Sequence, residues 1–374
     1  MLKRIWSLAI KEFIHLRSDW WMPAFMLIGG AMELLAVAWA TSRPITNLPI
    51  MIFDQSKTAA SHALVIGLEN TKTFAAPQQV NDMQTIQDAM DRGQINAAVI
   101  IPPDYAEQLQ SFVGHPTLLV IINGAENTPA QASNRAIQGL ARDIDQRILI
   151  QRLGLSAEQF SGFNPSLRVW FNENLSEALY TTPAELGMML EFTVLLFAAL
   201  AFSRERELGT IEQLLVMPFS SLEIIIGKSI PVIIVGFADF LLMLGMVHFA
   251  FDVPIRGSFL LLMVLAFGYL LVELGKGLVL SVISKTQHQA FLLVLLVGMV
   301  DFMFTGYAAP VESMPQVLRW FANVIPAHHW LTILRGIALK GAGMDVLWPN
   351  VLALAILGTV IGAFSLQFVR KALD

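Results

Sequence analysis

The sequence predicts a polytopic α-helical membrane protein with six transmembrane helices, and three observations support this fold class. Of the 374 residues, 55% are hydrophobic and only 14% are charged, whereas soluble globular proteins carry roughly a quarter charged residues. Six apolar stretches approach the length of about 20 residues that a helix needs to cross a bilayer. Between the first two stretches lies one long segment with a mixed, alternating pattern.

The six predicted transmembrane helices are joined by short loops in most places. They occupy residues 21–40, 184–202, 224–249, 259–283, 290–309 and 347–369. The first stretch is too long for the apolar part of a cleavable signal peptide, and no small-residue cleavage site precedes a polar mature start. We therefore expect it to remain as a permanent transmembrane helix.

Residues 1–20 predict an amphipathic helix ahead of the first span. Trp6, Phe13 and Leu16 belong to a set of apolar residues near one helical face, and four cations fall largely elsewhere: Lys3, Arg4, Lys11 and Arg17. A helix with this pattern lies in the membrane interface. The alternative is a plain extension of the first span into the cytosol.

Residues 41–183 predict an α/β domain between the first and second spans. Four short apolar runs have the composition of strands: LPIMIFD, INAAVIIP, TLLVIIN and SLRVWFN. They alternate with helical stretches such as MQTIQDAMDRG and PDYAEQLQSF. This alternation is typical of a small α/β domain.

The Lys and Arg residues of the short loops predict the orientation, because cytoplasmic loops carry an excess of them. If the N-terminus is cytoplasmic, ten of these cations lie in inside segments and four in outside loops, with residues 41–183 left out of the count. We therefore expect both termini in the cytoplasm and the α/β domain on the extracytoplasmic side.

The chain has no pattern for a catalytic, cofactor or metal site. Residues 227–229 read GKS, but a phosphate-binding loop needs a glycine five residues earlier, and position 222 is Leu. There is no cysteine for a thiolate site, and the net charge of −5 gives no basic surface for nucleic acid. We therefore expect a non-enzymatic chain, and uphill transport would need a partner chain or an ion gradient.

Several ionisable residues interrupt the apolar runs. A charge at the centre of a bilayer costs roughly 2.5–3.5 kcal/mol on insertion scales, so such residues usually face the helix bundle or a cavity. Glu273 and Lys276 are spaced to pair on one helix face, whereas Glu191 and Asp239 either pair across helices, stay protonated or line a path. Five residues are candidates for the translocation path: Glu191, Asp239, Glu273, Lys276 and Asp301.

Residues 203–223 form a charged, partly apolar gap between the second and third spans. Leu208, Ile211, Leu214 and Leu215 fall on one helical stripe, and Pro218 ends the pattern. This predicts a short cytoplasmic amphipathic helix. It either rests on lipid headgroups or docks into a groove on a partner protein.

This gap resembles the signature of ABC-type-2 transporter permeases, the membrane subunits of ABC exporters. The matching positions are Arg204, Glu205, Arg206, Gly209, Thr210, Glu212, Leu214, Leu215, Pro218, Gly227 and Lys228. A second match runs from Gly306 to Gly343, where the family has short helices that re-enter the outer leaflet; we therefore expect external re-entrant helices in residues 310–346. The match is carried by Pro310, Glu312, Met314, Pro315, Pro326 and Arg335.

The resemblance implies that the coupling helix, within residues 203–218, sits in a groove on a separate ATP-binding cassette subunit. ATP and Mg²⁺ would be bound by that subunit. The residues implied in coupling are Arg204, Glu205, Arg206, Gly209, Thr210, Glu212, Leu214, Leu215 and Pro218.

The resemblance also implies a second permease copy, identical or related, in a bacterial inner membrane. The expected activity is export of hydrophobic or amphiphilic compounds, in contact with membrane lipid and in some members with a periplasmic adaptor protein. Two alternatives stay open. One is a proton-coupled transporter that uses the intramembrane carboxylates, and the other is a membrane receptor with an extracytoplasmic ligand-binding domain.

Overall fold

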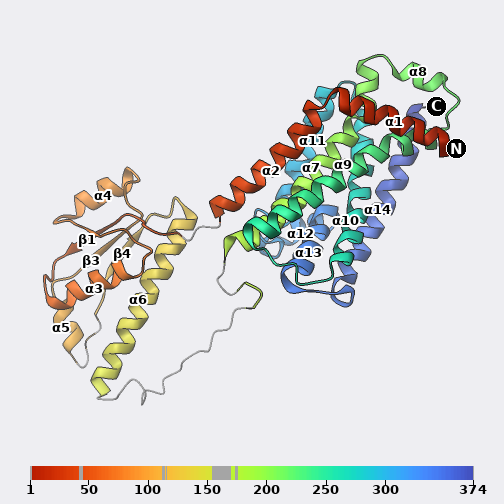
Figure 1. Ribbon diagram of the computed structural model, residues 1–374. Coiled ribbons are helices and arrows are strands. Elements are labelled where there is room, and N and C mark those ends of the chain that lie inside the picture. Colours follow the sequence, from red (N-terminus) through yellow and green to blue (C-terminus); the bar gives the residue numbers. More distant parts are fainter. Residues whose placement is uncertain are drawn as a thin grey trace. The chain divides into compact units, whose positions relative to one another are not determined.

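The computed structural model forms two units, each folded around its own core. Residues 1–43 and 168–374 make a helical unit, and residues 44–167 make a unit with a β-sheet (Figure 1). The structure describes residues 2–41, 45–111, 114, 116–153, 170–172 and 176–373.

The helical unit contains six helices that are long and apolar enough to cross a membrane in the described part of the chain. This confirms the prediction of six such helices. They are α2 (Trp21–Thr41), α7 (Glu177–Glu207), α9 (Ser221–Phe251), α10 (Phe259–Ile283), α11 (Gln287–Phe304) and α14 (Met344–Leu373).

Shorter helices lie at both ends of this unit. Figure 1 shows α1, α8 and both chain termini at one end, with α12 and α13 toward the other. Two termini at one end are what an even number of spans requires. The short elements are α1 (Leu2–Ser18), α8 (Ile211–Val216), a 3₁₀ turn (Val311–Ser313), α12 (Gln316–Ala322), α13 (Pro326–Arg335) and a π-helical turn (Gly336–Lys340).

Helix α7 is the central helix of the unit and packs against α2, α9, α10, α11 and α13. It approaches α10 closely at Gly277. A Cβ atom added there would lie 2.4 Å from the Cβ of Ala198 and 2.8 Å from the backbone oxygen of Leu195. The missing side chain of Gly277 therefore sets how near the two helices come.

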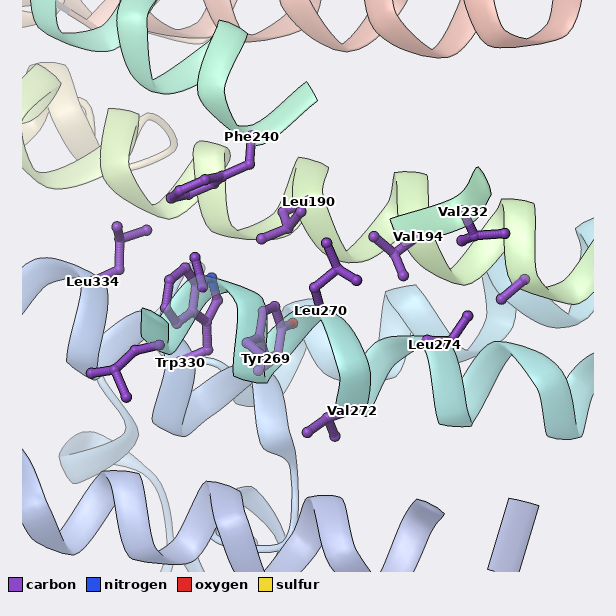
Figure 2. Close-up of a cluster of buried hydrophobic side chains, with 14 of the residues drawn as sticks. Leu190, Val194, Val232, Phe240, Tyr269, Leu270, Val272, Leu274, Trp330 and Leu334 are labelled. Carbon is purple, nitrogen blue, oxygen red and sulfur yellow. The ribbon is translucent and has the colours of Figure 1, made fainter. Parts of the chain in front are cut away.

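Aromatic side chains join three helices in the core of this unit. Tyr269 of α10 and Trp330 of α13 stack with ring centroids 5.1 Å apart, and Phe240 of α9 lies 6.0 Å from Trp330. Figure 2 shows these rings among apolar side chains that include Leu190 and Leu270. Burial of these large rings stabilises the bundle near the end that carries α13.

The second unit contains a four-stranded sheet with the order β2-β1-β3-β4. Strand β1 pairs in parallel with β2 and β3, and β4 runs antiparallel to β3. The strands are β1 (Ile50–Asp54), β2 (Gln78–Gln79), β3 (Ala97–Ile101) and β4 (Leu119–Ile122). β3 is buried along its whole length, as expected for a strand covered on both faces.

Helices cover both faces of this sheet. The helices α3 (Ala59–Asn70), α5 (Tyr105–Gln110) and α6 (Asn127–Leu153) pack on one face, and α4 (Met83–Asp91) packs on the other. Three of the predicted strand runs are thus strands of one α/β unit. The fourth run, at residues 166–172, lies mostly outside the described residues.

Candidate functional site

The charged gap between the second and third spans is split into two helices by Gly209. Helix α7 continues through the charged residues to Glu207, and α8 begins at Ile211. Gly209 has a φ of 68°, and the backbone N–H of Thr210 donates to the carbonyl of Glu205 over 2.9 Å. This is the helix-ending turn that glycine favours, because glycine adopts positive φ without strain. The prediction of one short helix over this stretch is therefore corrected: its first charges belong to the end of α7.

A buried ion network holds the end of α7 to α1 and α9. The ammonium of Lys228 lies 2.7 Å from a carboxylate oxygen of Glu12 and 3.2 Å from one of Glu205. Lys11 donates to the same oxygen of Glu205 over 2.8 Å, and the hydroxyl of Thr210 donates to the other. Because the Lys228 side chain is only 1% exposed, it depends on these carboxylates to offset the loss of solvation.

The neighbouring charges of α7 cap adjacent helices. Arg206 donates to the carbonyls of Val282 and Ser284 at the end of α10. Glu207 accepts from the backbone N–H of Gln287, the first residue of α11, over 2.8 Å. A cation at a helix C-terminus and an anion at an N-terminus each complement the helix dipole. Arg206 and Glu207 therefore attach the end of α7 to the adjacent ends of α10 and α11.

Helix α8 and the residues that flank it form an exposed surface between these anchored ends. Val216 is 86% exposed, and Leu208, Glu212 and Met217 are also exposed. Just after the C-terminal end of α8, Arg4 of α1 donates to the carbonyl of Pro218 over 2.8 Å. The helix is thus held at its start by the Glu205 network and after its end by α1, with apolar and acidic side chains facing outward.

A second ionic group lies inside the bundle around Lys276 of α10. Its ammonium is 3.1 Å from Glu191 of α7, 2.8 Å from Glu273 of α10 and 2.6 Å from Asp301 of α11. The hydroxyl of Tyr269 donates to Glu191 over 3.3 Å. We call these five residues the Lys276 cluster; it joins three membrane-length helices.

Asp239 of α9 lies fully buried with a neutral partner. Its carboxylate accepts a 2.7 Å hydrogen bond from the hydroxyl of Thr193. Its other oxygen makes no hydrogen bond within the described structure. Among the five candidate path residues, Asp239 is therefore the one that the structure keeps apart from Lys276.

Comparison with known proteins shows which family has this sequence. Residues 17–366 match the family described as ABC-2 family transporter protein. The chain belongs to this family. The ABC-2 family transporter is similar over at least 94% of its length to three proteins of Escherichia coli (strain K12). It is 27% identical to the probable multidrug ABC transporter permease YbhR over 371 residues, which is 99% of each chain.

The two other relatives also match over most of their length. The inner membrane transport permease YhhJ is 26% identical over 375 residues, which is 100% of this chain and 98% of YhhJ. The probable multidrug ABC transporter permease YbhS is 27% identical over 357 residues, or 94% and 93% of the two chains.

In this ABC-2 transporter the residues predicted for coupling have different surroundings. Arg204, Glu205 and Arg206 bind other parts of the bundle, with Arg204 3.2 Å from Asp19 of the segment after α1, and Thr210 binds Glu205. Gly209 ends α7, whereas Glu212 and Pro218 are exposed. The side chains of Leu214 and Leu215 lie outside the described part of the structure. The exposed set is the one available to another protein.

One group of side chains near Lys228 has the composition of a metal site. Ligand atoms of Glu12, His15 and Glu205 lie within 4.8 Å of one another. The ammonium of Lys228 already contacts both carboxylates. A dication would have to displace it, so the geometry fits an ion pair better than a metal.

A third polar network lies at the α12–α13 end of the ABC-2 transporter, and sequence patterns gave no sign of it. The hydroxyl of Tyr307 donates to Glu185 over 2.6 Å. The Arg335 guanidinium donates to the carbonyls of Gly306 and Tyr180 and stacks 3.9 Å over the Tyr180 ring. Burial and the Glu185 carboxylate raise the pKa of Tyr307, so its phenol stays protonated and acts as the donor.

Proposed function

We propose that this chain is the membrane-spanning subunit of an ATP-driven exporter of hydrophobic or amphiphilic compounds. Membership in the ABC-2 family carries the proposal, and two relatives bear the name probable multidrug ABC transporter permease. The sequence has no phosphate-binding loop of its own. ATP and Mg²⁺ are therefore assigned to a partner subunit.

The proposed orientation puts α1, α8 and both termini in the cytoplasm of a bacterium, with the chain in its inner membrane. The loop charges support it, as does the location of both termini at the end that carries α8 (Figure 1). The sheet unit would then be extracytoplasmic. The short helices between Val311 and Lys340 would enter the outer leaflet, since non-helical breaks at membrane depth need protein around them.

The proposed docking element for the ATP-binding subunit is the outward surface of α8. Exposed Val216 and Met217 offer apolar contacts and Glu212 offers a charge. The start of α8 is hydrogen-bonded through Thr210 to Glu205, and Glu205 contacts Lys228 of α9. A force on α8 would therefore act on α7 and α9 without passing through a flexible loop.

Co-purification with the ATP-binding subunit and substrate efflux from vesicles test this proposal. Val216→Asp places a charge in the proposed contact, so we expect loss of the partner subunit and of ATP-dependent efflux. Met83→Asp on α4, also at an exposed apolar residue, is the matched control and should retain both. Retention of the partner by Val216→Asp would overturn the docking site.

Efflux experiments also distinguish ATP-driven export from the two alternatives, a proton-coupled transporter and a receptor. An inactive ATP-binding subunit should abolish efflux, whereas a protonophore at constant ATP should not. The opposite pattern would indicate a proton-coupled transporter. A receptor would show ligand binding by the sheet unit and no efflux under either condition.

We also propose Asp239 as the candidate path residue to test first. The other three acids among the path candidates, Glu191, Glu273 and Asp301, each contact Lys276, which favours a role in holding helices together. Asp239 keeps one carboxylate oxygen without a hydrogen bond in the described structure. Asp239→Asn should reduce efflux with the partner subunit still bound, and unchanged efflux would remove Asp239 from the path.

The assembly that we propose contains a second permease copy, identical or related, and two ATP-binding subunits. Membrane-length helices with much exposed apolar surface support it: only 17% of the apolar window of α2, 22% of that of α11 and 11% of that of α14 is buried. These faces contact lipid or the second copy. An adaptor protein would meet the sheet unit. Cross-linking of purified complexes tests both contacts.

A further inference from the structure

The Lys276 cluster contains more acids than one ammonium can balance. Glu191, Glu273 and Asp301 each contact Lys276, and these are the ion pairs that the described structure gives to the three carboxyl groups. Three ionised carboxylates and one ammonium would leave a net charge of −2. Such an excess inside a membrane bundle is strongly unfavourable, because the effective penalty for an uncompensated buried ion is several kcal/mol.

The burial of the cluster excludes solvent as the source of compensation. The side chains of Glu191 and Glu273 are 0% exposed, and those of Asp301 and Lys276 are 7% and 14% exposed. The ammonium occupies the centre, in contact with all three acids. A metal ion would have to displace the ammonium, whereas a proton needs no additional room.

Burial and contact length identify the acids that hold protons. Glu191 and Glu273 are 0% exposed and lie 3.1 and 2.8 Å from the ammonium, whereas Asp301 is 7% exposed and lies 2.6 Å from it. Both oxygens of Glu273 are fully buried, and its contact with the ammonium at 2.8 Å is shared with the two other acids. A buried neutral acid costs much less than a buried carboxylate that is not fully compensated.

We propose that the Lys276 cluster is a proton-binding site that holds two protons at neutral pH, on Glu191 and Glu273, beside a Lys276–Asp301 ion pair. Asp301 is the ionised acid because it makes the shortest contact with the ammonium, 2.6 Å, and is the most exposed of the three acids. The cluster as a whole is then neutral. It holds α7, α10 and α11 together without a net buried charge, and the inference does not depend on the direction or substrate of transport.

Charge balance predicts how many protons each variant retains. The number of neutral acids equals the number of acids minus the number of ammonium groups, which is two in the wild type. Glu191→Gln, Glu273→Gln and Asp301→Asn should each retain one. Lys276→Met should retain three, because no ammonium remains to pair with an acid.

Infrared spectroscopy of the purified protein in lipid vesicles at neutral pH measures these protons directly, because a protonated carboxyl has its own carbonyl stretch. We expect a band that halves in Glu191→Gln and in Glu273→Gln, and disappears in the double variant, after subtraction of the contribution from other carboxyls. Asp143→Asn on exposed α6 is the matched control and should leave the band unchanged.

An unchanged band in both single variants would overturn the proposal, because it would show that Glu191 and Glu273 are ionised. Glutamine keeps the size and shape of glutamate, so both variants are suited to purification. If neither can be purified, Asp301→Asn decides, because charge balance predicts that this variant also loses half of the band. Absence of any protonated carboxyl band in the wild type contradicts the proposal.

Discussion

Replacing Lys228 with methionine should destabilise the end of the bundle that carries α8. The Lys228 ammonium is 2.7 Å from Glu12 and 3.2 Å from Glu205, with 1% of its side chain exposed. Removing one partner of a buried ion pair costs about 3–5 kcal/mol. Glu205 keeps its 2.8 Å contact with Lys11, so we expect a value near the lower limit, about 3 kcal/mol. This corresponds to a decrease of roughly 6–12 °C in the thermal midpoint of a unit of this size.

Thermal unfolding of the purified protein in lipid vesicles measures this change. The matched control is Arg92→Met on the sheet unit, because the Arg92–Asp88 pair has side chains 68% and 56% exposed. Such a surface pair contributes about 0–1 kcal/mol. Lys228→Arg keeps the charge and should lie between the wild type and Lys228→Met. Equal midpoints for the two methionine variants would refute the claim that burial makes the Lys228 network important.

Three further changes test other contacts. Gly277→Val puts side-chain atoms against Ala198, where even a Cβ would lie 2.4 Å away. We expect overpacking to cost about 1–3 kcal/mol and to lower the thermal midpoint. Gly268→Ala is the control and should leave the midpoint unchanged, because Gly268 faces open space. Arg335→Lys loses the paired donation and ring stacking on Tyr180, which should lower the midpoint by the equivalent of about 2 kcal/mol. Burial lowers the pKa of His328. The unfolded chain then binds more protons below pH ~6.5, so stability should fall as pH decreases through this value. His328→Gln should flatten that pH dependence, and an unchanged slope would contradict the assignment.

Much of the helical unit could be predicted because membrane segments are defined by local composition. Six apolar runs of sufficient length are visible in the sequence, and each corresponds to a helix. The exact ends of the helices were harder to predict from the sequence. Helix α11 ends at Phe304, short of residue 309, because the chain turns at Gly306 with a φ of 87°. The backbone angle at Gly209 was likewise not predictable, although its effect is to separate α8 from α7.

The polar networks show where sequence reasoning reached its limit. The spacing of Glu273 and Lys276 predicted their pairing, because both residues are on one helix and their distance follows from helix geometry. The contacts of Lys276 with Glu191 and Asp301 depend on the rotation and depth of three separate helices. Lys228 was part of the family signature, but nothing local showed that Glu12 would reach it.

Helix α7 supplies one acid to each of the three polar networks. Its 31 residues form a rod of about 45 Å. Along it, Glu185 meets Tyr307, Glu191 meets Lys276, and Glu205 meets Lys228. An axial displacement of α7 by about one helical turn, roughly 5 Å, would break all three sets of contacts together. The helix therefore links the two ends of the bundle mechanically, and small independent movements at either end are suppressed in favour of one concerted shift.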